Sequence, residues 1–158
     1  MKKSAIAISA LLLVFATSCC RTETTATGCC SAGDSACNAA QSEIPAIRKT
    51  LDMYIEASVK GDSRIAGPAF ASTATISHAE NGKLVSAPIS DLFAFYDSGS
   101  MPASYEISAC NVAGDVAIVR IESRFGETRY ADMFSLVKDG SEWKIISKVF
   151  HVKGDHEE

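Results

Sequence analysis

The C-terminal half of the chain constrains the fold most strongly, because four long stretches alternate apolar and polar residues. These stretches cover residues 105–112, 116–125, 130–138 and 143–152. Short turns join them around Gly114, Gly126 and the Asp139-Gly140 pair. Because glycine permits tight turns between antiparallel strands, we expect four consecutive strands of one sheet.

Helical spacing precedes these strands. Ser42 is a suitable N-cap, Pro45 fits a first turn, and Gly61 ends the pattern. The apolar positions between them are Ile44, Ile47, Leu51, Tyr54, Ile55 and Val59. A helix with one buried stripe is therefore expected over about residues 42–60.

Shorter elements follow this helix. Asp62 can cap a short helix over residues 63–70 that ends with Phe70 turned inward. Residues 73–78 and 83–86 predict two strands around Asn81-Gly82, a dipeptide typical of a type I′ hairpin. A third helix is expected at about residues 88–98, with Ile89, Leu92, Phe93 and Tyr96 inward.

The first 18 residues are typical of an export signal, with Lys2 and Lys3 before an apolar run that is too short to span a membrane. The string ATSC at residues 16–19 resembles the lipobox of bacterial lipoproteins, although Ala16 stands where leucine is usual. Cleavage before Cys19 and its lipidation would make the protein a membrane-anchored lipoprotein of the cell envelope. A plain secretory peptide that is cut nearby is the alternative.

Residues 19–41 contain few large apolar side chains and predict a disordered tether. This segment holds all of the cysteines except Cys110. A disulfide such as Cys30 with Cys37 is one arrangement, but adjacent cysteines leave the pairing open. The spacing lacks the ligand pairs of a zinc site, so we expect no metal and no cofactor. Residues 42–153 then form the folded domain, and residues 154–158 form a charged tail.

Asp132 is a carboxylate among the inward positions of the last two strands. If Val137 pairs with Glu142, Asp132 lies opposite Ser147. In the same register Leu136 lies opposite Trp143, Phe134 opposite Ile145 and Tyr130 opposite Val149. The two neighbouring strands contribute further residues to the same face of the sheet, namely Ala117, Val119, Ile121, Ser123, Phe125, Tyr105, Ile107 and Ala109. A buried carboxylate needs hydrogen bonds or water, so we expect either a cavity or a structural partner beside Asp132.

The reverse face of the sheet mixes apolar and basic positions. It carries Ile118, Met133, Ile146 and Phe150 among Arg120, Arg129, Lys144 and Lys148. A half-buried face of this kind is typical of a subunit interface, and we expect a homodimer through the sheet.

The chain is mildly acidic, with 15 Lys and Arg against 19 Asp and Glu. This balance argues against nucleic acid as a partner.

The order of elements resembles the nuclear-transport-factor-2-like fold, which is a cystatin-like fold. Within it, residues 44–153 are similar to the lumazine-binding family through YIEASVKGD (54–62), AF (69–70), ATIS (74–77), YADMF (130–134) and GSEWKIISKVF (140–150). The resemblance implies an α+β cone, in which about three helices close over a curved mixed or antiparallel sheet. It also implies a flavin-like or pteridine-like ligand, although the chain has no glycine-rich phosphate loop and no basic pocket cluster.

We favour a pocket for a small hydrophobic or aromatic ligand. The expected pocket residues are Tyr54, Tyr96, Tyr105, Ser123, Tyr130, Asp132 and Ser147. Similarity to ketosteroid isomerases suggests an alternative, an enzyme with Asp132 as acid or base and Tyr54 or His78 at an oxyanion. The first strand, however, lacks the carboxylate that serves those isomerases as base. Asp132 could equally form a structural pair with Ser147, and an interaction module with a filled cone is a third hypothesis.

Overall fold

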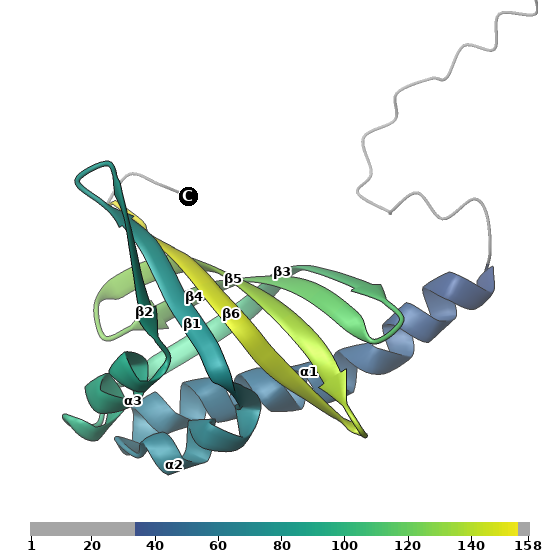
Figure 1. Cartoon of the computed structure of the whole chain (residues 1–158), viewed down its shortest axis with the longest axis horizontal. Helices are drawn as coiled ribbons and strands as arrows, with labels where there is room; N and C mark the ends of the chain where they lie inside the picture. Colours follow the sequence, from purple (N-terminus) through teal and green to yellow (C-terminus); the bar gives the residue numbers. More distant parts are fainter. Residues whose placement is uncertain (1–33, 155–158) are drawn as a thin grey trace, which may run out of the picture.

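A long helix, α1 (Asp34–Lys60), crosses one side of a strongly twisted six-stranded sheet in the computed structural model, and two short helices gather at one end of it (Figure 1). The structure describes residues 34–154, with side chains from Gln41 onward. The predicted signal peptide, Cys19, the tether up to residue 33 and residues 155–158 lie outside the described part of the chain.

Helix α1 begins earlier than expected. It starts at Asp34 rather than Ser42, so the prediction of a disordered tether was wrong for residues 34–41, and Pro45 lies inside the helix. This segment contains Ala36, Ala39 and Ala40 and no β-branched residue. Alanine is the best helix former, so a lack of large apolar residues does not by itself indicate disorder.

The inner side of α1 packs on the sheet. Ile47, Leu51 and Tyr54 are almost fully buried, as expected, whereas Val59 is 41% exposed because the buried stripe passes through Ala57 and Ser58 instead. Near its other end the two carboxylate oxygens of Glu43 accept from Lys138 Nζ at 2.7 Å and from Trp143 Nε1 at 2.9 Å. These contacts fix α1 to the turn that joins the last two strands.

Gly61 ends α1 with a positive φ of 64°. Its N–H donates to Ser58 O and the N–H of Asp62 donates to Ala57 O, which is the Schellman arrangement. Asp62 then accepts from the backbone N–H of Arg64 and caps α2 (Ser63–Ala66), as predicted. A 3₁₀ turn, η1 (Gly67–Ala69), leads to the buried Phe70.

The predicted hairpin and third helix are confirmed. Strands β1 (Phe70–Glu80) and β2 (Lys83–Pro88) meet at Asn81 and Gly82, whose φ angles of 51° and 74° fit a type I′ turn. Helix α3 (Ser90–Asp97) buries Tyr96, and Ile89 is buried just before it.

The remaining strands complete a sheet of order β2-β1-β6-β5-β4-β3, with β3 (Ala103–Ala113), β4 (Val116–Phe125), β5 (Thr128–Asp139) and β6 (Glu142–Val152). Only β1 and β6 are parallel, so the sheet is mixed. The predicted α+β fold with three helices on a curved mixed sheet is confirmed. In the described part of the chain no helix has both the length and the apolar character needed to cross a membrane.

The predicted register between β5 and β6 is wrong. Asp139 pairs with Glu142 across a two-residue turn, and Leu136 therefore lies opposite Ile145 instead of Trp143. This shift of two residues leaves the inward face unchanged, so Phe134, Leu136, Trp143 and Ile145 are all buried as expected.

A bulge at Ile146 then changes the face. Ser135 pairs with Ser147, and Asp132 pairs with Phe150 rather than Ser147. The extra residue reverses the alternation, which turns Lys148 and Phe150 inward and leaves Val149 47% exposed. A second irregularity at Ser108 in β3 leaves Ala109 exposed and makes Cys110 pack against the core.

Gly61 should tolerate no side chain. A Cβ there would lie 2.7 Å from Ser100 N and 2.9 Å from Gly99 C, both backbone atoms. Gly140 has nearly the same φ, 63°, but open space around it. An alanine at position 140 would therefore show only the cost of placing a side chain in the left-handed backbone region, about 1–2 kcal/mol. We expect Gly61→Ala to lower the free energy of unfolding by roughly 3 kcal/mol or more, and Gly140→Ala by only the smaller amount. Urea denaturation of both variants measures this, and equal losses would contradict the close packing at Gly61.

Candidate functional site

A cavity of about 380 Å³ lies between α3 and the strands β1, β2 and β6. Its wall is mostly aliphatic and aromatic, and the residues that line it are Tyr54, Ile76, His78, Val85, Ala87, Asp91, Leu92, Phe95, Phe125, Tyr130, Lys148 and Phe150. The size and the few polar groups are those of a pocket for a small organic molecule.

Asp132 is fully buried next to this cavity and is completely satisfied. Its Oδ2 accepts from Ser123 Oγ at 2.5 Å and from Tyr54 Oη at 3.4 Å. Its Oδ1 accepts from Lys148 Nζ at 2.6 Å. The two residues form a buried ion pair, in which the side chain of Asp132 is 0% exposed and that of Lys148 is 5% exposed. Asp132 does not line the cavity itself, but two of its partners, Tyr54 and Lys148, do.

Lys148 is the most deeply buried charged group of the cavity wall, which also carries His78, Asp91 and the hydroxyl-bearing rings of Tyr54 and Tyr130. Its Nζ lies 4.1 Å from the ring centroid of Phe150, 5.8 Å from that of Tyr54 and 6.0 Å from that of Tyr130, all rings of the cavity wall. An ammonium group has three N–H donors, and among the described residues Asp132 is the acceptor for one. For the other two donors the described residues provide no further hydrogen-bond acceptor, and the nearest ring face is that of Phe150. Burial lowers the pKa of Lys148, and the charge and hydrogen bond of Asp132 oppose that shift.

Two buried tyrosines surround the carboxylate. Burial, and then the negative charge of Asp132, raises the pKa of Tyr54 well above its usual value, and the same two causes act on Tyr96. Tyr96 packs edge-on against Tyr54 with the centroids 6.3 Å apart. Its hydroxyl is fully buried and has no hydrogen-bond partner among the described residues. Both phenols are therefore held in the neutral form at physiological pH.

The structure brings together some of the residues that the sequence suggested. Tyr54, Tyr130 and His78 line the cavity, and the His78 ring stacks on Phe150 with the centroids 4.6 Å apart. Ser123, Asp132 and Tyr96 lie behind this wall.

Tyr105 and Ser147 were placed wrongly. Tyr105 packs against α1, where its hydroxyl donates to Asp52 Oδ1 at 2.6 Å. Ser147 pairs with Ser135 because of the bulge at Ile146, so neither residue lies in the lining.

Sequence reasoning missed Lys148 and Phe150 as site residues, because strict alternation assigned both to the reverse face. The sequence signal of the bulge is that two adjacent apolar pairs, Ile145-Ile146 and Val149-Phe150, interrupt the alternation of this strand. Cys110 is half-buried in β3, and burial raises the pKa of its thiol. Among the side chains that the structure describes, residues 41–154, no three His, Cys, Asp or Glu groups converge in a way that could hold a metal ion.

Comparisons with known proteins agree with this architecture. A family model described as "Putative lumazine-binding" matches residues 42–151. A protein named "Aldolase FrzH" from Cladobotryum sp is 31% identical over 114 residues, which cover 70% of this chain and 91% of that protein.

Two solved structures are similar as well. An NTF2-like protein from Shewanella baltica is 32% identical, with a TM-score of 0.66 over 73% of this chain and 97% of that one. An NTF2-like protein from Methylobacillus flagellatus is 29% identical, with a TM-score of 0.65 over 72% and 94% of the two chains. These matches confirm the family resemblance that the sequence suggested.

The buried pair of Asp132 and Lys148 should show strong coupling in stability. Lys148→Met leaves a buried carboxylate without its counter-ion, a change that typically costs about 3–5 kcal/mol. The double variant Asp132→Asn/Lys148→Met removes both charges, so we expect it to be more stable than the sum of the single losses by about 2 kcal/mol or more. Chemical denaturation of the four proteins measures this coupling.

Lys144→Met is the matched control on the same strand. Lys144 is 21% exposed, pairs with the 58% exposed Glu142 and donates to Pro68 O at 2.7 Å, so its loss should cost about 1 kcal/mol, well below the loss at Lys148. Additive losses at Asp132 and Lys148 would contradict a buried ion pair.

Proposed function

The chain belongs to the family described as "Putative lumazine-binding", and on that premise we propose that its cavity binds a small, largely apolar molecule that carries a hydrogen-bond acceptor. The single observation that carries this proposal is the position of Lys148. Its ammonium group has donors to spare in a wall made mostly of aliphatic and aromatic side chains.

The chemistry of the wall suggests the character of the ligand. Phe150, Tyr130, Phe125 and Phe95 offer ring faces and edges to a flat or aromatic body. At one side of the cavity, Lys148 would hold a carbonyl, enolate or similar oxygen. The only carboxylate in the lining is Asp91, which is exposed on α3, so the inner wall favours an acceptor over a cation.

An enzyme is the second candidate, and two observations favour it. The relative from Cladobotryum is named an aldolase, and Lys148 and Asp132 form an acid–base pair next to the cavity. The earlier hypothesis made Asp132 the group that acts on the substrate. In this geometry Asp132 would act through Lys148, because Lys148 lines the cavity and Asp132 does not. His78 lies on the same wall, where it could assist a proton transfer.

Filling the cavity tests the proposed binding. Ala87→Trp places a large ring in the cavity, whereas Leu84→Trp on the same strand changes a residue that is 81% exposed and lies outside the lining. A metabolite that raises the melting temperature of the wild type should do the same for Leu84→Trp and not for Ala87→Trp. Differential scanning fluorimetry with a panel of aromatic and carbonyl metabolites measures this. Equal shifts in both variants, or no shift with any compound, would contradict binding in this cavity.

We also propose a membrane anchor through Cys19. The support is the signal-like sequence of residues 1–18 and the ATSC string. Cys19→Ala should release the protein from the membrane fraction, and a variant that stays in that fraction would contradict the anchor.

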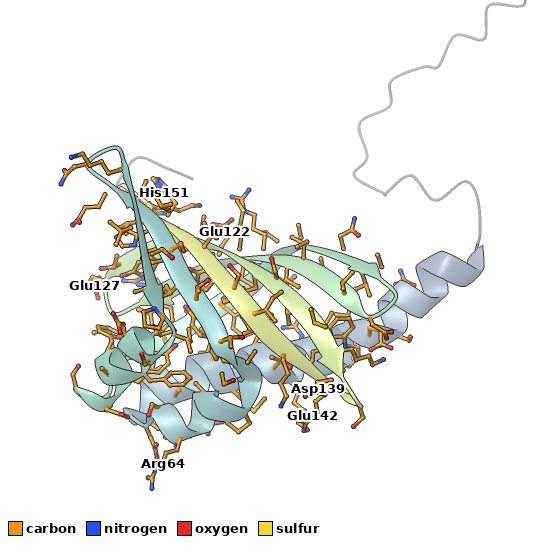
Figure 2. The ribbon with its side chains drawn as sticks, in the orientation of Figure 1. Arg64, Glu122, Glu127, Asp139, Glu142 and His151 are labelled. Carbon is orange, nitrogen blue, oxygen red and sulfur yellow. The ribbon has the colours of Figure 1, made fainter. Side chains whose placement is uncertain are left out.

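The outer face of the sheet supports a further proposal, a homodimer. Ile118, Met133, Ile146 and Val149 are 57%, 50%, 42% and 47% exposed on this face. Figure 2 shows Glu122 on the side of the sheet away from the helices, where it pairs with Arg120 and Lys153. The variant Ile118→Lys/Met133→Lys should be monomeric by sedimentation, and a dimer in this variant, or a monomeric wild type, would contradict the proposal.

A further inference from the structure

We propose that Lys148 forms a covalent imine with aldehydes or ketones that enter the cavity, with Asp132 as its proton acceptor and donor. This inference rests on the proposed binding function and names the chemical class of the ligand. It would make the cavity a site for carbonyl compounds in particular.

The position of the amine is the first argument. Lys148 Nζ is almost inaccessible to bulk water, yet it lies beside three rings that line the cavity. A carbonyl compound in the cavity would thus meet the amine on a side that Asp132 does not occupy. Lys144 on the last strand and Lys153 directly after it pair with Glu142 and Glu122 outside this cavity.

The partner of the amine is the second argument. Imine formation needs a neutral amine, and a carboxylate 2.6 Å away can take the proton. In a poorly solvated site an ammonium and a carboxylate are both costly to keep charged. Transfer of one proton from the ammonium to the carboxylate removes both charges, and this transfer therefore becomes accessible. Burial also lowers the pKa of Lys148, which acts in the same direction.

The steps balance within this pair of residues. Asp132 accepts a proton from the ammonium group, and the nitrogen lone pair then forms a C–N bond with the carbonyl carbon. The carbonyl π electrons move to oxygen, which takes a proton from the nitrogen to give a carbinolamine. Asp132 returns its proton to this hydroxyl group, the C–O bond breaks, and water leaves. The protonated imine remains paired with the Asp132 carboxylate.

The surrounding groups suit such an adduct. Ser123 and Tyr54 hold the carboxylate in place through Oδ2, which leaves Oδ1 for the nitrogen. The rings of Phe150 and Tyr130 would contact the substituent of the imine. Tyr54 is held neutral by burial, so it can donate but does not add a second negative charge.

Reductive trapping tests this inference. The purified full-length protein is incubated at neutral pH with equimolar benzaldehyde and sodium cyanoborohydride, which delivers hydride to the imine carbon and leaves a benzyl-lysine. Intact mass spectrometry counts the benzyl groups. Trypsin does not cleave after a benzylated lysine, so modification at Lys148 yields the uncut peptide of residues 145–153, IISKVFHVK.

We expect Lys148 to carry most of the benzyl label, because its amine lies at the cavity wall beside a proton acceptor and burial lowers its pKa. Lys148→Arg removes the primary amine, keeps the charge and should lose this product. Lys144→Arg is the matched control and should keep it. Circular dichroism verifies that each variant folds, and the double variant Asp132→Asn/Lys148→Met, which lacks the amine at this position, serves as a second blank.

Benzyl alcohol separates this inference from the binding proposal, because it has the same ring and no carbonyl. If both compounds raise the melting temperature but no adduct forms at Lys148, imine formation is wrong and binding stands. If adducts spread equally over surface lysines in the wild type and in Lys148→Arg, imine formation at Lys148 is likewise wrong. If neither compound shifts the melting temperature and no adduct forms, the imine is excluded and the cavity does not bind small aromatic compounds.

Discussion

The site depends on one buried ion pair, in which Lys148 Nζ lies 2.6 Å from Asp132 Oδ1. Transfer of either charge alone into a protein interior costs several kcal/mol, so each residue requires the other. The hydroxyl groups of Ser123 and Tyr54 satisfy the second carboxylate oxygen. The pair therefore links β4, β5, β6 and α1 at the inner end of the cavity and fixes the direction of the amine.

The bulge at Ile146 makes this pair possible. Without the extra residue, Lys148 and Phe150 would point away from the helices, and Asp132 would lack a counter-ion. The bulge also lies where β6 meets β1 in parallel, since Ile76 pairs with Lys148 and both line the cavity. A single local irregularity in one strand thus decides which side chains the cavity presents.

Most of the fold follows from local sequence patterns. Alternation locates the long strands, Asn81-Gly82 locates the hairpin, and helical spacing locates the buried side of α1. Each of these patterns involves residues that are close together in the chain, so it can be recognised in a single sequence. Asp132 stands out for the same reason, since a carboxylate at a buried position has to be satisfied.

The identity of its partner could not be obtained in this way. A bulge leaves little trace in composition, and strict alternation placed Ser147 rather than Lys148 on the inner face. The pairing of Tyr105 with Asp52 on α1 was missed because it is a contact between distant elements. Strand register and contacts between distant elements could not be predicted from the sequence, because tertiary packing sets them.

The most direct test of this account is the titration of Lys148 itself. The ε-carbon and ζ-nitrogen resonances of lysines in labelled protein, assigned with Lys148→Arg, report the protonation of each amine in solution. The account predicts that Lys148 titrates below the usual lysine pKa of about 10.4 and that its resonances shift when a carbonyl ligand is added. A Lys148 that titrates together with the surface lysines and does not respond to any ligand would contradict it.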